Sequence, residues 1–233
     1  MKKPRILIVA TSAAQMYNGE PTGVWLEELT TPYYAFKDSG APVVLASVSG
    51  GVIPIDARSV SSAGENDASV ERYLSDAAAQ NALATTKAAS DFTADDFDIL
   101  FLPGGHGTMF DYPQSEALAA LVEAFDRAGK VVAAVCHGPA GLVSAKTIDG
   151  APLVADRTVA GFTNSEEHAV GLEDAVPFLL ETRLAELGAN YRSGPDFQPF
   201  AVRDRNLVTG QNPASATRTA ELALDAFAAT ELA

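Results

Sequence analysis

The chain contains one cysteine, Cys136, and His137 follows it directly. An apolar run, KVVAAV, leads into this pair, and Gly138 and Pro139 come immediately after it. A nucleophile between a strand and a helix stands on a sharp turn, the nucleophile elbow, close to free N–H groups of the helix. We therefore predict that Cys136 is a nucleophile with a depressed thiol pKa and that His137 is its partner. A small buried hydrophobic side chain is the alternative for a lone cysteine.

The loop LPGGHG, residues 102–107, follows a second apolar run. Its three glycines leave backbone N–H groups open to close approach by a ligand. Because both loops would meet at one edge of the sheet, we predict that the N–H groups of Gly105 and His137 form an oxyanion hole. We also expect His106 to contact the substrate. An ordinary glycine-rich turn is the alternative interpretation.

Two pairs of glutamates lie near the starts of predicted helices, Glu27 with Glu28 and Glu166 with Glu167. Acidic residues in a first helical turn stabilise the helix through its dipole, and Thr163, Asn164 or Ser165 can cap the second helix. A Cys–His pair, however, needs a third group that orients the imidazole. We keep the structural role for Glu27. For the other three glutamates, the residues alone leave a structural and a catalytic role open.

Four apolar runs of strand length predict the strands that must position these loops, at residues 5–10, 43–47, 99–102 and 131–135. The runs are continuously apolar, which is typical of parallel strands covered by helices on both faces. Helical patterns alternate with them at residues 25–37, 68–80, 115–127 and 139–145, and a last one covers residues 214–228. The alternation predicts an α/β sandwich that binds its ligand beyond the carboxyl ends of the strands.

We expect one domain over residues 1–233, with insertions around residues 49–91 and 165–194. The second insertion has a helical pattern at residues 175–187. Because neither insertion belongs to the strand and helix alternation, we expect them to supply the walls of the substrate pocket.

The composition excludes several classes of protein. Thirty acidic and sixteen basic residues give a net charge of −14, which repels nucleic acid and anionic membranes. The apolar run near the N-terminus, residues 6–10, is shorter than the ~7–15 residues of a signal core or the ~18 of a membrane span. We expect a soluble, cytoplasmic protein. One cysteine and three histidines predict neither a disulfide nor a closed zinc site, so we expect no metal.

Five motifs together make the chain resemble the DJ-1/PfpI superfamily: AVCHGPAGL, LPGGHGTMFDYP, GVWLEELTTPYYAF, GFTNSEE and LVTGQNPASA. The resemblance covers residues 5–227 and is strongest to the chaperone-like, glutathione-independent glyoxalase III branch. It implies a flavodoxin-like three-layer sandwich of the class I glutamine amidotransferase-like type, a homodimer, no cofactor and a Cys–His–Glu triad. By motif, Glu167 is the triad acid, with Glu166 as the alternative. Glu28 matches the helix glutamate that hydrogen-bonds the reactive sulfur.

The resemblance implies that a small aldehyde, methylglyoxal, is converted to lactate, with a chaperone or damage-repair role beside it. Glu166 and His106 are then expected to contact the substrate. A cysteine peptidase or an isocyanide hydratase of the same superfamily stays open, and so does a redox-sensing holdase without turnover in which Cys136 is oxidised to a sulfinate. A glutamine amidotransferase is excluded, because its His-x-Glu pair is missing: Ala169 and Val170 follow His168.

Overall fold

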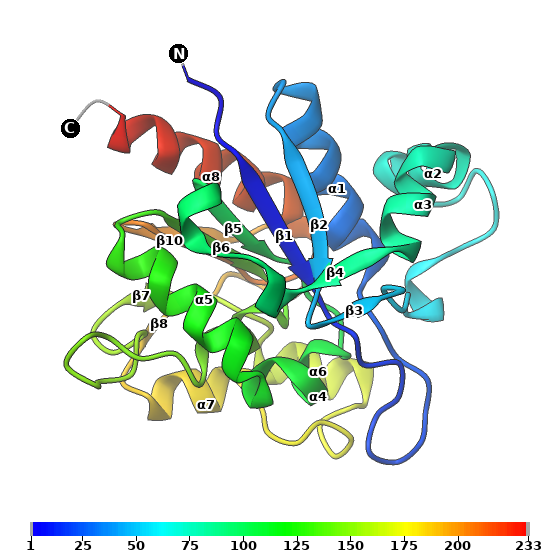
Figure 1. Cartoon of the computed structure of the whole chain (residues 1–233). Coiled ribbons are helices and arrows are strands. Elements are labelled where there is room, and N and C mark those ends of the chain that lie inside the picture. The colour runs from blue at the N-terminus through cyan, green and yellow to red at the C-terminus, as the bar shows by residue number, and fades with distance from the viewer. Residues whose placement is uncertain (1, 232–233) are drawn as a thin grey trace.

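A computed structural model describes residues 2–231; residue 1 and residues 232–233, the ends of the expected 1–233 domain, lie outside the described part. Its centre is a sheet of parallel strands (Figure 1). In spatial order these are β2 (Val43–Ser47), β1 (Ile6–Ala10), β5 (Ile99–Leu102), β6 (Val131–Val135) and β10 (Leu207–Gly210). This is the flavodoxin-like strand order, so the predicted fold class and its four strands are confirmed.

Short strands extend the sheet at both edges, to eight strands in the described residues. They are β4 (Thr86–Ala88), parallel to β2, and the antiparallel edge strands β3 (Ser49–Gly51) and β9 (Ala201–Asp204). A separate pair is formed by β7 (Thr158–Val159) and β8 (Asn190–Tyr191). These strands have two to four residues, too few for a recognisable hydrophobic period.

Helices cover both faces of the sheet, because successive residues of a strand point to opposite sides (Figure 1). Ile6 and Ile8 of β1 enter one hydrophobic cluster, and Leu7 and Val9 enter the other. The first cluster contains α1 (Leu26–Asp38), α2 (Ala68–Ser75), α3 (Ala77–Ala84) and α8 (Ala216–Thr230). The second contains α5 (Glu116–Arg127) and α7 (Leu180–Glu186).

The remaining helices are short and lie in the connections. Two of them, α4 (Thr108–Asp111) and α6 (Asn164–Val170), lie beyond the carboxyl ends of the strands (Figure 1). The 3-10 helices are η1 (Ala57–Ser59), η2 (Ala89–Asp91), η3 (Ala94–Asp96), η4 (Tyr112–Gln114), η5 (Gly138–Leu142) and η6 (Pro213–Ser215). Within the described residues, no helix is both long and apolar enough to span a membrane.

Three predicted helices differ from the structure. The pattern at residues 68–80 is divided into α2 and α3, because Asp76 accepts hydrogen bonds from the N–H groups of Ala78 and Ala79 and starts a new helix. At residues 175–187 only α7 forms. Pro177 has no backbone N–H to donate and restricts the residue before it to extended conformations, so the helix begins after the proline. Residues 139–145 contain the tighter helix η5 instead of an α-helix.

The tight turn after β6 requires glycine at position 138. A Cβ atom there would lie 2.2 Å from the carbonyl oxygen of Leu102, at the end of the neighbouring strand β5. The close approach of these two backbones holds the loops after β5 and β6 side by side. Nearby Gly161 is less crowded, since its added Cβ would approach no atom closer than 3.4 Å.

We predict that Gly138→Ala lowers the free energy of unfolding by about 2–4 kcal/mol, because the backbone of β5 must move. Gly161→Ala is the matched control and should change it by less than about 1 kcal/mol. Urea denaturation of both variants measures the difference. Equal losses in the two variants would contradict the role given to this contact.

Candidate active site

Cys136 follows β6 with a φ of 60°, in the left-handed region that non-glycine residues rarely adopt. Two backbone hydrogen bonds hold it there: its N–H donates to Gly210 at 2.9 Å, and its carbonyl accepts from Phe162 at 2.9 Å. Such strain persists only where the surroundings enforce it. The turn therefore has the predicted geometry of a nucleophile elbow, although only 4% of the cysteine is exposed.

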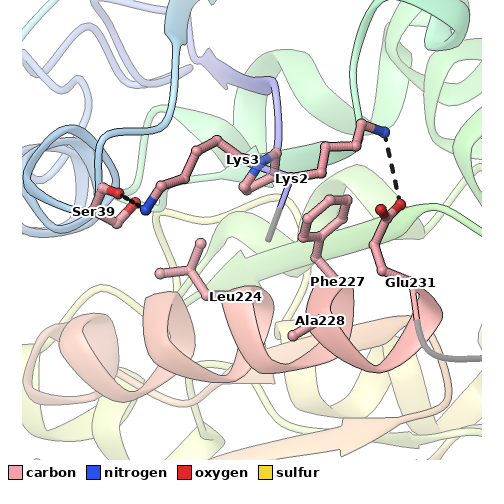
Figure 2. A pocket seen from close by; sticks show the side chains of 8 residues that line it. Lys2, Lys3, Ser39, Leu224, Phe227, Ala228 and Glu231 are labelled. Carbon is pink, nitrogen blue, oxygen red and sulfur yellow. Dashed lines mark hydrogen bonds and ion pairs between the residues drawn. The ribbon is translucent and has the colours of Figure 1, made fainter.

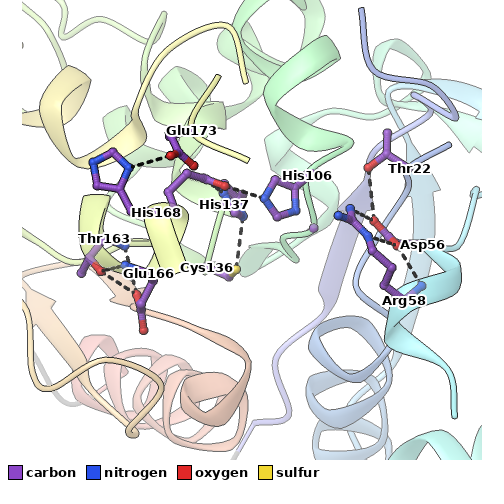
Figure 3. A network of polar contacts seen from close by, with 12 residues as sticks. Thr22, Asp56, Arg58, His106, Cys136, His137, Thr163, Glu166, His168 and Glu173 are labelled. Carbon is purple, nitrogen blue, oxygen red and sulfur yellow. Dashed lines mark hydrogen bonds and ion pairs between the residues drawn. The ribbon is translucent and has the colours of Figure 1, made fainter. Parts of the chain in front are cut away.

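His137 lies between the thiol and a buried carboxylate (Figure 3). Its Nδ1 is 3.4 Å from Sγ of Cys136, and its Nε2 is 2.7 Å from Oε2 of Glu167. The other oxygen of Glu167 lies 2.8 Å from Nε2 of His106. The structure thus brings together the three residues of the predicted triad, and it adds a second histidine on the same carboxylate.

The burial of this cluster sets its charges. Burial lowers the pKa of His106 to about 4, with a smaller contribution from His137, so its imidazole is neutral at pH 7. Burial alone would raise the pKa of Glu167, but the two histidines outweigh it and hold that pKa well below its ordinary value. An ionised carboxylate only accepts hydrogen bonds. Both Nε2 atoms therefore donate to Glu167, which leaves Nδ1 of His137 as an acceptor facing the thiol.

The thiol itself does not have the depressed pKa that we predicted from the elbow. Burial raises the pKa of Cys136 well above its ordinary value, the neighbouring Glu28 carboxyl group acts in the same direction, and the His137 N–H acts against them. Desolvation of a thiolate at a site with so little exposure outweighs the stabilising N–H. Cys136 accordingly holds its proton as a thiol at neutral pH.

Glu28 lies on α1 and is completely buried next to the thiol. Burial raises its pKa well above the ordinary value, and the contact with Cys136 lowers it by less, so burial favours the protonated carboxyl group. Gly104 makes room for it, since a Cβ there would lie 2.5 Å from Oε2 of Glu28. A protonated carboxyl group beside sulfur is a hydrogen-bond donor and adds no repulsion to a thiolate.

The two N–H groups of the predicted oxyanion hole both border the site. Neither Gly105 nor His137 donates its N–H to a backbone carbonyl within residues 2–231. Gly105 has a φ of 98°, and a Cβ on it would lie 2.4 Å from the nitrogen of Trp25, so only glycine fits. Both residues line the cavity that contains Cys136, so an oxyanion formed there could accept from both N–H groups.

These groups surround a cavity of 130 Å³. It is lined by Trp25, Glu28, Gly105, His106, Cys136, His137, Phe162, Val170, Phe197 and Pro213. Residues 49–91 contribute nothing to this lining, and residues 165–194 contribute only Val170, so the expectation that the insertions form the walls was wrong. The walls are mostly apolar. Trp25 and Phe162 lie in the motifs GVWLEELTTPYYAF and GFTNSEE, which stood out in the sequence for their glutamates. No feature of the sequence indicated that Phe197 would line the cavity.

Glu166 is turned away from this cavity. Its Oε2 accepts from the N–H and the hydroxyl of Thr163, both at 3.0 Å, in the predicted cap of α6. Its Oε1 accepts from the N–H of Phe197 at 2.7 Å and from the amides of Gln211 and Asn212 at 3.1 and 2.8 Å. Because both oxygens are fully engaged within the protein, this position does not fit the substrate contact expected of Glu166.

Among the described residues, one cluster has the donor spacing of a metal site: His106, His137 and Glu167, whose ligand atoms lie within 4.8 Å of one another. The nitrogens and oxygens concerned are already paired in the hydrogen bonds above. A metal ion would have to displace both Nε2 protons.

A second cavity, of 370 Å³, lies between the N-terminal segment and α8 (Figure 2). Lys2, Lys3 and Glu231 border it, together with apolar residues of α8 that include Leu224 and Phe227. Its lining includes neither a cysteine nor a histidine, and none of the residues around Cys136 lines it. The chemistry therefore belongs to the smaller cavity.

The fold and the site together define a class of protein: flavodoxin-like sandwiches with a strained cysteine on the turn after a central strand. Comparison with known proteins identifies the family within this class. The model of the DJ-1/PfpI family matches residues 21–226, and the chain belongs to this family.

Two relatives match nearly the whole chain. Glutathione-independent glyoxalase HSP31 of Saccharomyces cerevisiae is 33% identical over 97% of this chain and 99% of its own. Glyoxalase 3 of Candida albicans is 36% identical over 96% of this chain and 98% of its own. The crystal structure of glyoxalase III from Candida albicans has 32% identity and a TM-score of 0.86, covering 96% of this chain and 97% of that one.

The lowered pKa of His106 predicts a specific dependence of stability on pH. Below pH 6.5, the ordinary pKa of a histidine, the His106 imidazole of the unfolded chain binds a proton. In the folded chain the same imidazole stays neutral until about pH 4. Stability is therefore lost as pH falls through this range, by about 2 kcal/mol between pH 7 and 5. We predict that His106→Asn removes this contribution to the loss of stability between pH 7 and 5. Urea denaturation at each pH measures the free energy of unfolding.

His168→Asn is the matched control, because it also replaces a histidine and its side chain is 57% exposed. It should keep the wild-type slope. The same slope in His106→Asn and in the wild type would show that this imidazole is not held neutral by the fold.

Proposed function

We propose that this protein is a glutathione-independent glyoxalase that converts methylglyoxal to lactate, with Cys136 as the nucleophile. The observation that carries the proposal is a thiol in a cavity of only 130 Å³, beside a histidine that is paired with a buried carboxylate. Pockets for drug-sized ligands measure roughly 300–1,000 Å³, so this one suits a molecule of a few heavy atoms. The names of the two full-length relatives support the same reaction.

The first step is addition of the thiol to the aldehyde carbon, C1. His137 takes the Sγ proton at Nδ1 as the C–S bond forms, and the π electrons of the carbonyl move to its oxygen, O1. The N–H groups of Gly105 and His137 stabilise this alkoxide, and the protonated Glu28 supports the sulfur. The imidazolium then returns its proton to O1. The product is a neutral hemithioacetal.

The second step moves two protons without any external oxidant. His137 removes the C1 hydrogen, the electron pair forms a double bond to C2, and the negative charge passes to the ketone oxygen, O2. The imidazolium then protonates C2. The O1 proton must also reach O2, and we assign this transfer to His106, which lines the cavity and whose buried Nδ1 has no partner among the described residues. A neutral histidine suits such a transfer between oxygens. The result is a thioester of lactate.

Hydrolysis completes the cycle. His137 takes a proton from water, the hydroxide adds to C1, and the C–S bond breaks so that Sγ leaves and recovers the proton. Glu167 stabilises each imidazolium that forms on His137, because it lies 2.7 Å from Nε2. The same carboxylate therefore serves all three steps.

A peptidase is less well supported by this geometry. An amide in a polypeptide has chain on both sides and must reach the nucleophile in an open groove. Here Cys136 is only 4% exposed, and the aromatic residues Trp25, Phe162 and Phe197 line the cavity that contains it. Among the activities of the superfamily, conversion of a small carbonyl compound fits this enclosure best.

We predict that Cys136→Ala lowers lactate formation from methylglyoxal at least about 1,000-fold, because the covalent route is lost. The measurement is enzymatic detection of D- and L-lactate without added glutathione, with glyoxal, an isocyanide and unfolded casein as parallel substrates. Circular dichroism and urea denaturation confirm the fold of the variant. Full activity in this variant, or wild-type turnover of casein alone, would overturn the proposal.

A further inference from the structure

Phe197 stands at the mouth of the active-site cavity in a strained conformation. Its φ is 56°, which is unfavourable for a bulky side chain and persists only where neighbours enforce it. The ring lines the cavity, lies edge-on to Phe162 at 6.3 Å between centroids, and is 43% exposed. The residue thus joins the buried thiol site to the surface.

The conformation of Phe197 is held by a buried carboxylate that has no part in the chemistry. Oε1 of Glu166 accepts the Phe197 N–H at 2.7 Å and also binds the amides of Gln211 and Asn212. Those amides hold the rest of the loop: Gln211 accepts from the N–H of Gly194 at 2.8 Å, and Asn212 donates to the carbonyl of Gln198 at 2.9 Å. Both ends of the loop are therefore fixed to one ionisable centre.

We infer that Phe197 is a specificity-determining residue, whose ring limits the site to 2-oxoaldehydes with a small substituent, and that Glu166 is its positioning residue. This rests on the proposed glyoxalase function. The cavity of 130 Å³ has its reactive thiol next to Gly105 and His137, so a substituent on the substrate must extend toward the rim. Removal of the phenyl ring opens this side and leaves the catalytic groups in place.

The test is the ratio of kcat/KM for phenylglyoxal to that for methylglyoxal, two 2-oxoaldehydes that differ only in the substituent. We expect Phe197→Ala to raise this ratio at least about tenfold over the wild type. Phe197→Tyr keeps the ring and should keep the ratio, and so should Tyr17→Ala, which removes an exposed aromatic ring elsewhere. Glu166→Gln should raise the ratio as well, because the loop loses its anchor while Phe197 is still present.

A second readout needs no turnover. Since Cys136 is the only cysteine, the alkylation rates of the protein by N-phenylmaleimide and by iodoacetamide report how large a reagent can reach Sγ. Their ratio should also rise at least about tenfold in Phe197→Ala. If the wild type does not turn over methylglyoxal, the proposed function fails, and the alkylation ratio still decides this inference. Both ratios within twofold of wild type in folded Phe197→Ala would overturn it.

Discussion

The site depends on the burial of one carboxylate between two imidazoles. Glu167 accepts hydrogen bonds at 2.7 and 2.8 Å from His137 and His106, and these bonds offset the cost of removing its charge from water. The carboxylate also determines which nitrogens carry protons. Because both Nε2 atoms donate to it, Nδ1 of His137 is left free to accept the proton of the Cys136 thiol. In the proposed mechanism, this single buried charge enables His137 to deprotonate the desolvated thiol.

The sheet supplies the precision that this arrangement needs. Cys136, Gly105 and Glu28 come from three segments distant in the sequence. They meet because β5 pairs with β6 and because Trp25, at the start of α1, donates its N–H to Gly104 in the loop after β5. Glycines at positions 104 and 138 allow the backbones to approach where any side chain would collide. The strain at Cys136 is tolerated because the adjacent strand and the following loop hold its backbone.

Much of this could be predicted from the sequence, where the pattern is local. Continuous apolar runs identified the central strands, and the Gly138-Pro139 pair after Cys136 identified the elbow. Glu166 and Glu167 could not be separated in this way. Adjacent helical residues point about 100° apart, so one side chain reaches the histidines and the other reaches the loop of Phe197. Which residue faces which partner depends on the packing of α6.

The errors have the same physical origin. The thiol pKa was expected to be low from the helix N-terminus, yet burial has the larger effect, and burial depends on the tertiary fold. The pocket walls were assigned to the two long insertions, but the rim includes Phe197, whose left-handed conformation depends on contacts across the chain. Local motifs identified the residues of the proposed triad, whereas the enclosure of the site arises from residues distant in the sequence.

The most direct test of the central claim is the kcat for methylglyoxal of Glu167→Gln, measured beside its neighbour Glu166→Gln. An amide at position 167 cannot stabilise an imidazolium on His137, so we predict a loss in kcat of at least about 100-fold. Glu166→Gln should stay within about tenfold of the wild type, since it acts on the loop and not on the histidine. Equal losses in two folded variants, or the larger loss in Glu166→Gln, would contradict the account.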